Sequence, residues 1–289
     1  MARILVTGGS GFLGRKVLAA LVEQGHVVYA LIHRHTLDID GVTSIIGDID
    51  KPAELLEKIQ ESKQSFDIVL HMIGIIREKP PSITFQKLHT EATINIVTIT
   101  QQLRIPKIVY ISALGTGKNA PGSYFQSKYQ SEEAIKSSGL TYIILRPSII
   151  WDVPSELANQ LKYLNLPPFI TLTPGKSLNI VQPILRKDIA AIISDIIEKP
   201  QAENTILEAG GAKKYTFRDF VKMTGRRKKF TIPIPLILLK VALRTADFLH
   251  IPLPITSTQL SMLQINNTVT TEKCVLQVTS VRPSPAFSA

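Results

Sequence analysis

A glycine-rich turn close to the start of the chain constrains the fold more than any other feature. Residues 3–7 form a short apolar run that is typical of a β-strand, and residues 11–24 have the apolar spacing of an amphipathic helix. Such a turn lets the backbone approach a pyrophosphate closely, and the helix N-terminus presents free N–H groups to that anion. The sequence therefore predicts dinucleotide binding by Gly8, Gly9, Ser10, Gly11, Phe12, Leu13 and Gly14.

Strand-like and helix-like segments alternate through the first half of the chain. We expect strands at residues 3–7, 27–32, 44–46, 67–72, 107–112 and 141–145, and helices at 11–24, 52–62, 85–103 and 127–138. This alternation predicts an α/β fold, namely a Rossmann-type doubly wound parallel sheet with a smaller C-terminal lobe. The expected domains are a nucleotide-binding domain at 1–150 to which 176–200 returns, a smaller lobe at 151–175 and 201–265, and an extended tail at 266–289.

The residues after the second predicted strand bear on the choice between NAD and NADP. An acidic residue at this point would hold the ribose 2′-hydroxyl of NAD. Here Arg34 follows the strand, and no carboxylate comes before Asp38. Arg34 could grip a 2′-phosphate with help from Arg15, although both could equally be exposed surface cations. NADP(H) is therefore favoured over NAD(H).

Three further positions follow predicted strands at the edge where a cofactor would lie. Asp48 comes just after the third strand, where its carboxylate would meet the adenine amino group or serve only as a turn residue. Ile73 and Gly74 follow the fourth strand and would lie beside the inner ribose of the cofactor.

A tyrosine and a lysine four residues apart supply the candidate chemistry. Tyr124 and Lys128 would project from one face of a helix directly after the fifth strand. A nearby ammonium is expected to lower the pKa of the phenol, so that tyrosine can act as an acid or base near neutral pH. Ser112, at the end of the fifth strand, could hydrogen-bond a substrate oxygen.

Composition and charge limit the other classes of function. The net charge of +10 favours an anionic partner, but the basic residues are mostly scattered and no nucleic-acid-binding motif is present. The single cysteine, Cys274, excludes an internal disulfide and favours a reducing, cytoplasmic location. The histidines lack metal-ligand spacing, so no metal site is expected. We expect neither a signal peptide nor a membrane-spanning segment.

From the N-terminus to about residue 265, the chain resembles the extended or atypical short-chain dehydrogenase/reductases. The motifs that carry the resemblance are the turn at 7–14, Gly47-Asp48, Tyr124-x-x-x-Lys128, Leu145-Arg146-Pro147-Ser148, residues 207–211 and the helix start at 216–219. Within that superfamily the chain is most similar to relatives of the NADPH-binding accessory subunit of respiratory complex I. The resemblance implies that Tyr124 is the acid/base, that Lys128 binds the nicotinamide ribose and tunes Tyr124, and that Ser112 polarises a carbonyl. It also adds Pro147 to the expected cofactor contacts.

One position departs from the family pattern. The family's fourth helix usually carries an asparagine that organises a proton relay, and His89 stands in its place here, with Asn95 further along. A histidine can also carry a proton, or it can be an ordinary helix-surface residue. This departure bears directly on whether the protein is an active reductase.

An apolar helix is expected at residues 236–250, between two proline-rich segments. Its polar residues Lys240, Arg244 and Asp247 share one face, and the basic run 226–229 lies just upstream. The helix either covers the substrate cleft with its polar face in water, or acts as an interfacial element that meets a membrane or a membrane protein.

The leading hypothesis is an NADP(H)-binding oxidoreductase that transfers hydride and uses Tyr124 as the proton donor to an unidentified small molecule. The alternative is a non-catalytic structural or assembly factor, associated with a membrane respiratory complex, that keeps the nucleotide as a stabilising ligand. A sugar-nucleotide epimerase or dehydratase also fits the fold, but the basic end of the second strand argues against it, since such epimerases resemble NAD binders.

Overall fold

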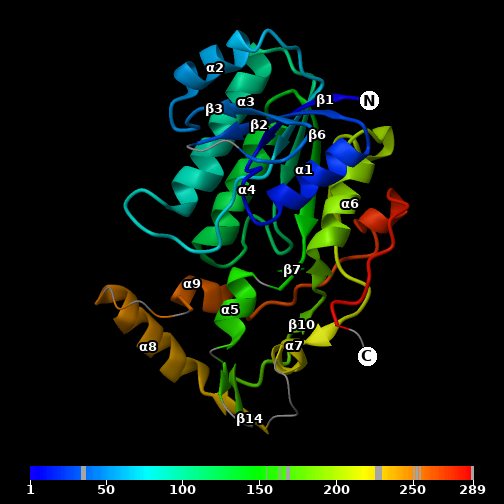
Figure 1. The fold of residues 1–289 in the computed structure, drawn as a ribbon. Helices are drawn as coiled ribbons and strands as arrows, with labels where there is room; N and C mark the ends of the chain where they lie inside the picture. The colour runs from blue at the N-terminus through cyan, green and yellow to red at the C-terminus, as the bar shows by residue number, and fades with distance from the viewer. Residues whose placement is uncertain are drawn as a thin grey trace.

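A parallel sheet with helices on both faces forms most of the computed structural model (Figure 1). The structure describes residues 1–33, 37–153, 155–162, 164–166, 170–224, 230–249, 251, 253 and 255–287. The strands of the main sheet are β1 (Arg3–Thr7), β2 (Val27–Ile32), β3 (Val42–Ile46), β4 (Ile68–His71), β5 (Lys107–Ile111), β6 (Thr141–Pro147) and β12 (Thr205–Ala209). They lie in the order β12-β6-β5-β4-β1-β2-β3, and all neighbours are parallel. This order confirms the predicted Rossmann-type fold.

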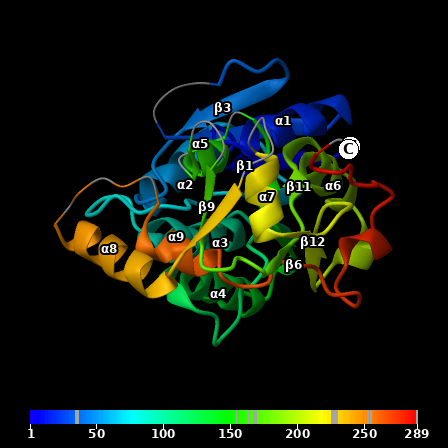
Figure 2. The same cartoon turned by 90° about the horizontal axis from the view of Figure 1, so that it is seen from below.

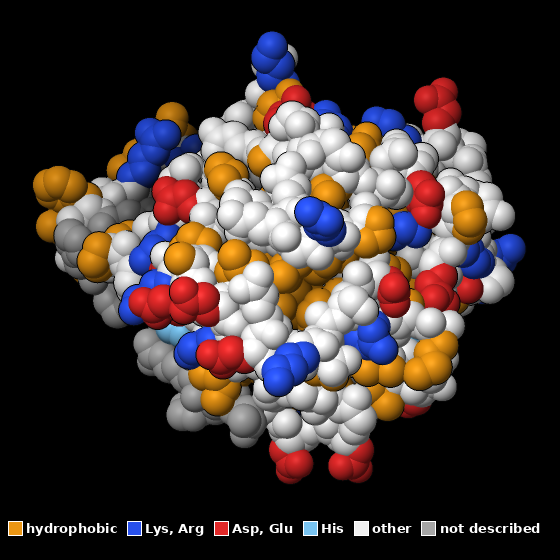
Figure 3. All heavy atoms as spheres, turned by 90° about the horizontal axis from the view of Figure 1, so that it is seen from above, with side chains coloured by type: hydrophobic (Ala, Val, Ile, Leu, Met, Phe, Trp, Pro, Cys, Tyr) orange, Lys and Arg blue, Asp and Glu red, His pale blue; other side chains and the backbone are white. Residues whose placement is uncertain are grey.

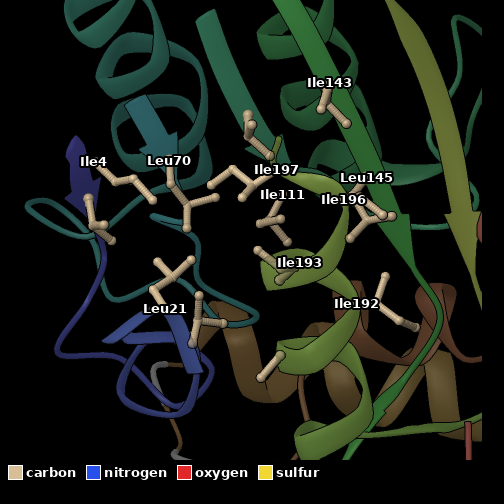
Figure 4. Packing of buried hydrophobic residues seen from close by; sticks show 14 of the residues in the cluster. Ile4, Leu21, Leu70, Ile111, Ile143, Leu145, Ile192, Ile193, Ile196 and Ile197 are labelled. Atoms are coloured by element: carbon tan, nitrogen blue, oxygen red, sulfur yellow. The ribbon is translucent and has the colours of Figure 1, made fainter. Parts of the chain in front are cut away.

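Helices cover both faces of this sheet because its strands are apolar on both faces. They are α1 (Gly14–Glu23), α2 (Pro52–Glu61), α3 (Ala92–Gln102), α4 (Gly122–Lys136) and α6 (Arg186–Ile196). Alternate residues of β1 point to opposite sides, so Ile4 joins the core with α1 and α6 while Leu5 joins the core with α2, α3 and α4. Figure 4 shows Ile192, Ile193 and Ile196 of α6 lying against the sheet residues of the first core.

A smaller part of the chain lies beyond the carboxyl ends of the strands (Figure 1). Its elements are β7 (Ile150–Trp151), α5 (Glu156–Lys162), β8 (Asn165–Leu166), β9 (Ile170–Pro174), β10 (Ile180–Val181), β11 (Ile184–Leu185), β13 (Tyr215–Thr216), α7 (Phe217–Met223), β14 (Phe230–Ile234), α8 (Leu236–Phe248) and α9 (Ser257–Met262). The short turns are a π-helical turn η1 (Gln86–Glu91) and the 3₁₀ turns η2 (Pro200–Ala202) and η3 (Val275–Gln277). Figure 2 shows α8 at the edge of the molecule, with α9 between α8 and α4.

Several segments differ from the sequence-based expectation. The helix expected at 85–103 is divided into η1 and α3. Helix α4 begins at Gly122, directly after the extended residue Pro121, rather than at 127. Residues 177–184 hold only β10 and the first residue of β11. Residues 151–175, for which the sequence predicted neither a strand nor a helix, contain α5, β8 and β9. These short elements are stabilised by pairing with distant segments, such as β14 with β9, which leaves no local pattern.

The division into lobes stays a prediction, although two segments lie differently from what it implies. β12 falls in the range given to the smaller lobe, yet it pairs with β6 in the main sheet. The expected tail also packs back on the protein, since Val275 is fully buried and Phe287 lies 5.6 Å from Trp151 between ring centroids. None of the described helices combines the length and the apolar character needed to cross a membrane.

Candidate active site

A cavity of about 630 Å³ lies at the carboxyl ends of β1, β4, β5 and β6. This is the edge where parallel α/β sheets bind ligands, next to the point at which the strand order reverses between β1 and β4. Ten of the residues singled out in the sequence line it, namely Gly8, Gly11, Phe12, Leu13, Gly14, Gly74, Ser112, Tyr124, Lys128 and Pro147. Gly9, Ser10, Asp48 and Ile73 do not contribute to its lining, and Arg34 lies outside the described residues.

The glycine turn has a shape that only glycine can give at two positions. Gly8 has a φ of +74°, and a Cβ there would lie 2.7 Å from the carbonyl carbon of Met72. A Cβ on Gly14 would lie 2.2 Å from the carbonyl oxygen of Gly8. The turn therefore brings bare backbone to the cavity wall, as close approach to a pyrophosphate requires.

The N-terminus of α1 fits an anionic ligand. No side chain caps this end by a hydrogen bond, and no acidic residue lies in its first turn. The N–H groups of Arg15, Lys16 and Val17 donate to carbonyl oxygens of the turn, so the positive end of the helix dipole and the N–H groups before Arg15 favour a phosphate at this position. These features fit the pyrophosphate of a dinucleotide.

Asp48 lies beside the end of β2 but outside the cavity lining. Its Oδ2 is 3.4 Å from Nε2 of His33, and its Oδ1 accepts a hydrogen bond of 3.0 Å from the backbone N–H of Asp50. The second contact is that of a turn residue, which was one of the two interpretations of this position. The carboxylate is also partly exposed, so it is accessible to the adenine amino group of a bound cofactor as well.

Tyr124 and Lys128 lie one helical turn apart on α4 and both line the cavity. The Tyr124 ring makes edge contacts with Phe85, His89 and Phe125 at centroid distances of 5.2 to 5.5 Å. None of the described residues hydrogen-bonds its hydroxyl in this arrangement. The Lys128 ammonium donates to the carbonyl oxygen of Ile111 at 3.1 Å.

Burial sets the protonation of this pair. It raises the pKa of Tyr124 to about 12, so the expected lowering of this pKa by Lys128 is wrong. The reason is that burial removes water from around the phenol, which disfavours its charged form. Burial also lowers the pKa of Lys128 to about 7, against the opposing effect of the Glu132 carboxylate. At neutral pH the phenol is therefore protonated and can act as an acid.

Ser112 lies in the cavity lining, but its hydroxyl proton is engaged elsewhere. The Ser112 hydroxyl donates to Oε1 of Glu132 at 2.5 Å. Arg146 holds the same carboxylate in a bidentate pair, with Nε 2.8 Å from Oε1 and Nη2 2.5 Å from Oε2. Because a serine hydroxyl has one proton, Ser112 in this arrangement has none left to polarise a substrate carbonyl.

His89 is fully buried, so the interpretation as a helix-surface residue is wrong. Its Nε2 accepts a hydrogen bond of 3.0 Å from the backbone N–H of Ile75, and its Nδ1 lies 2.8 Å from Oγ of Ser127. Ser127 in turn donates to the backbone carbonyl of Tyr124 at 2.8 Å. A neutral ring with its proton on Nδ1 satisfies all three contacts. His89 therefore fixes the loop after β4 against the helix that carries Tyr124.

A second buried histidine extends these contacts to the glycine turn. The hydroxyl of Thr7, next to Gly8, lies 2.6 Å from Nδ1 of His71. Nε2 of His71 lies 3.1 Å from Oγ1 of Thr93, whose hydroxyl donates to the carbonyl oxygen of His89. The hydrogen bonds run in one direction from β1 to α4, with every donor used once. Because Thr93 and Ser127 donate to backbone carbonyl oxygens, which have no proton to pass on, these contacts position groups and do not form a continuous proton relay.

The two histidines predict acid sensitivity. Burial, followed by the positive charge of Lys128, lowers the pKa of His71 to about 3 and that of His89 to about 2. As the pH falls below the ordinary value of 6.5, the unfolded chain takes up protons that the folded chain refuses. The free energy of unfolding should thus fall by up to about 1.4 kcal/mol per pH unit for each histidine.

Urea unfolding at steps of pH from 6.5 to about 3 measures this slope. His89→Gln should reduce the slope, whereas His33→Gln, at an exposed position, should leave it unchanged. A slope that His89→Gln does not alter would contradict the buried neutral state of His89.

Some residues of the site carry no sequence signal that we used. Arg146 was noted only as part of a motif and Glu132 was not singled out, although together they form the one buried bidentate ion pair among the described residues. The spacing of Lys128 and Glu132 by four residues on one helix could have suggested a contact. The roles of His71 and Ser127 depend on partners 22 to 64 residues away, which no local pattern reveals.

Comparisons with known proteins agree with this geometry. Residues 8–200 match the model of a family described as NAD(P)H-binding. The chain is 28% identical over 172 residues to a 2-alkyl-3-oxoalkanoate reductase from Stenotrophomonas maltophilia. The matched region covers 52% of this chain and 51% of that protein. It is 21% identical over 243 residues to the mitochondrial NADH-ubiquinone oxidoreductase 40 kDa subunit of Neurospora crassa, covering 81% of this chain and 63% of that subunit. The second match confirms the predicted resemblance to complex I subunits.

Solved structures share the fold at low sequence identity. An NADPH-dependent quinone oxidoreductase from Escherichia coli, complexed with NADPH, superposes with a TM-score of 0.74 at 16% identity, covering 98% of this chain and 96% of that one. The chain spans less than two thirds of the length of the curated relatives named above.

Proposed function

Because this chain belongs to the family of NAD(P)H-binding proteins, we propose that it is an NADP(H)-dependent oxidoreductase in which Tyr124 donates the proton. The observation that carries the proposal is that Tyr124 and Lys128 line the same cavity as the glycine turn. A ligand bound along Gly8 and Gly14 would thus extend toward a protonated phenol. The names of the relatives, which include a reductase and an oxidoreductase subunit, support the same class of reaction.

Tyr124, Lys128 and His89 have different roles in the proposed reduction. NADPH, when bound, supplies the hydride. Tyr124 holds its proton at neutral pH and has no competing acceptor among the described residues, so it can protonate a carbonyl oxygen. Lys128, with a pKa of about 7, lies one helical turn from Tyr124 in the same cavity lining and offers a donor for a ribose hydroxyl. The chain of contacts through His89 holds Tyr124 in place.

The preference for NADP(H) rests on the charges near the end of β2. His33, rather than a carboxylate, follows the strand, and Arg15 is exposed in the first turn of α1. Arg34 follows in the sequence. One or two charge-assisted hydrogen bonds to a 2′-phosphate would favour NADPH over NADH by about 10- to 100-fold.

Fluorescence titration with NADPH and NADH tests this preference. Arg34→Gln should bring the two dissociation constants together, whereas Lys213→Gln, an exposed cation after β12, should leave their ratio unchanged. Equal dissociation constants of NADPH and NADH in the unaltered protein would contradict the preference for NADPH. Oxidation of NADPH in the presence of carbonyl compounds and quinones then tests for catalysis itself.

A second function is supported by the exposed face of α8. This helix buries Leu243 and Ala246 and exposes a second set of apolar side chains on its opposite side. The exposed set is Ile237, Leu238, Val241 and Phe248, together with Leu249 just after the helix, with exposed fractions of 56 to 81%. Monomeric proteins seldom present such a surface to water without a partner.

We propose that an anionic membrane surface covers this face. Lys240 and Arg244 are exposed on one flank of the apolar stripe, where they would meet lipid phosphates while the apolar side chains enter the boundary of the acyl chains. The basic run at 226–229 precedes the helix but lies outside the described residues. Elsewhere the charges are mixed, as Figure 3 shows for the opposite end of the molecule, where Lys and Arg are interspersed with Asp and Glu. A nucleotide-binding factor held at a membrane would use this surface without any turnover.

Co-sedimentation with vesicles tests the membrane surface. Binding should require anionic lipid and should weaken by about fivefold for each of Lys240→Gln and Arg244→Gln. Val241→Ser and Phe248→Ser should also reduce binding, whereas Ile94→Ser, at an exposed apolar position on α3, should not. Equal binding to neutral and anionic vesicles would rule out this proposal.

A further inference from the structure

The wall of the cavity beyond the glycine turn points to the class of substrate. We infer that the substrate is a lipophilic compound with one reducible carbonyl group, not a sugar or another polyhydroxylated molecule. This inference rests on the proposed reductase function. Apolar side chains from four separate segments line this end of the cavity, including Ile83, Phe125, Leu157, Leu161, Met262 and Ile265.

The polar side chains in the same wall are already engaged with the protein. Asn267 donates to the carbonyl oxygen of Leu114 at 3.1 Å, and its Oδ1 accepts from the backbone N–H of Ile149 at 3.1 Å and from the Ser148 hydroxyl. These contacts hold the segment after β6 to the segment after α9. Asn267 and Ser148 are therefore parts of the wall that are not available to bind substrate hydroxyls.

Gln259 and Ser155 are engaged in the same way. Gln259 accepts from the backbone N–H of Thr256 at 3.1 Å and donates to Oε1 of Gln160 at 3.3 Å. The Ser155 hydroxyl accepts from the backbone N–H of Ala158 at 3.0 Å, which leaves it one proton to donate. A sugar entering this space would lose the water around its several hydroxyls and regain few hydrogen bonds, which opposes its binding.

The charges in the lining are few and lie toward one side. No aspartate or glutamate lines the cavity among the described residues, and Lys128 is already assigned to the Tyr124 site. Arg77 and Lys79 are the other cations, and both belong to the partly exposed loop after β4. The space between Phe125 and Leu161 is therefore bounded mainly by hydrocarbon, and Tyr124 remains as the donor that a single carbonyl oxygen needs.

The reaction is a two-electron reduction. The carbonyl carbon gains a hydride, its oxygen gains the Tyr124 proton, and NADPH is oxidised to NADP⁺. Tyr124 regains its proton from solvent. No other co-reactant is required, and the product is an alcohol with the same lipophilic body, secondary where the substrate is a ketone.

The single tryptophan gives a probe of this end of the cavity. Trp151 is buried in the same cluster as Leu161, and its neighbour Ile150 lines the cavity. In protein saturated with NADP⁺, which prevents reduction, 2-alkanones from 2-butanone to 2-decanone should change the Trp151 fluorescence saturably. The dissociation constant should fall about fourfold for each methylene that becomes buried. Affinity that does not depend on chain length, or saturable binding of UDP-glucose, would overturn the inference.

Methionine substitutions separate the cavity wall from the rest of the surface. Met262→Gln, which keeps the side-chain length but adds an amide, should weaken 2-decanone binding about tenfold. Met262→Leu should change it less than threefold, as should Met223→Gln, at an exposed position on α7 outside the cavity. Equal effects of the two Met→Gln variants would contradict a substrate contact at Met262.

Oxidation of NADPH in the same samples distinguishes this inference from the function on which it rests. Oxidation with dihydroxyacetone but not with 2-alkanones would overturn the lipophilic substrate and leave the reductase intact. Binding of 2-alkanones with the expected chain-length dependence, but without oxidation of NADPH, would overturn the reductase and leave the ligand class standing. Oxidation that increases with alkyl chain length supports both.

Discussion

Tyr124→Phe is expected to lower kcat by about 10²- to 10⁴-fold, which is the contribution of a positioned general acid. The substitution removes one oxygen atom and its proton. It leaves the ring in its contacts with Phe85 and His89, because these are made by carbon faces and edges. NADPH binding should change less than about threefold, since the glycine turn is formed by other residues.

The measurement is NADPH oxidation with the best 2-alkanone, alongside fluorescence titration of NADPH. Tyr129→Phe is the matched control, because Tyr129 lies on the same helix but outside the cavity lining, and it should retain full activity. If Tyr124→Phe keeps more than about a tenth of kcat, another group supplies the proton. If NADPH binds tightly and neither protein turns over any carbonyl, the non-catalytic function remains.

The parts of the site that sequence alone predicted are those formed by neighbours along the chain. The glycine turn follows directly on β1, and both Gly8 and Gly14 are required by contacts at the turn and the adjoining strand. Tyr124 and Lys128 share a helix, so their spacing was enough to bring them to one side. The order of strands followed in the same way, because alternating strands and helices permit few topologies.

The parts that sequence did not predict depend on segments far apart. The Ser112 hydroxyl donates a hydrogen bond to Glu132, twenty positions away. The tautomer of His89 depends on its contacts with Ile75 and Ser127. The pKa of Tyr124 was expected to fall because one charge was considered without the desolvation that accompanies it. These hydrogen bonds and this pKa depend on contacts and burial in three dimensions, which a single sequence does not reveal.

Glu132→Gln is expected to lower the free energy of unfolding by about 3–5 kcal/mol. The Glu132 side chain is fully buried and that of Arg146 is only 11% exposed, so removing the carboxylate charge leaves a guanidinium that water cannot solvate. The substitution keeps the size of the side chain and an oxygen that can accept from Ser112. The loss therefore reports the uncompensated charge and not a cavity.

Urea unfolding gives the free energies, with Glu133→Gln as the matched control. Glu133 is the next residue of α4 and pairs with Lys136, but its side chain is 45% exposed, so the same substitution should cost less than about 1 kcal/mol. The double variant Glu132→Leu, Arg146→Met removes both charges and should be more stable than Glu132→Gln, because no buried ion is left without a partner. A double variant less stable than Glu132→Gln would mean that the pair stabilises α4 through its hydrogen bonds, including that from Ser112, more than through the balance of charge.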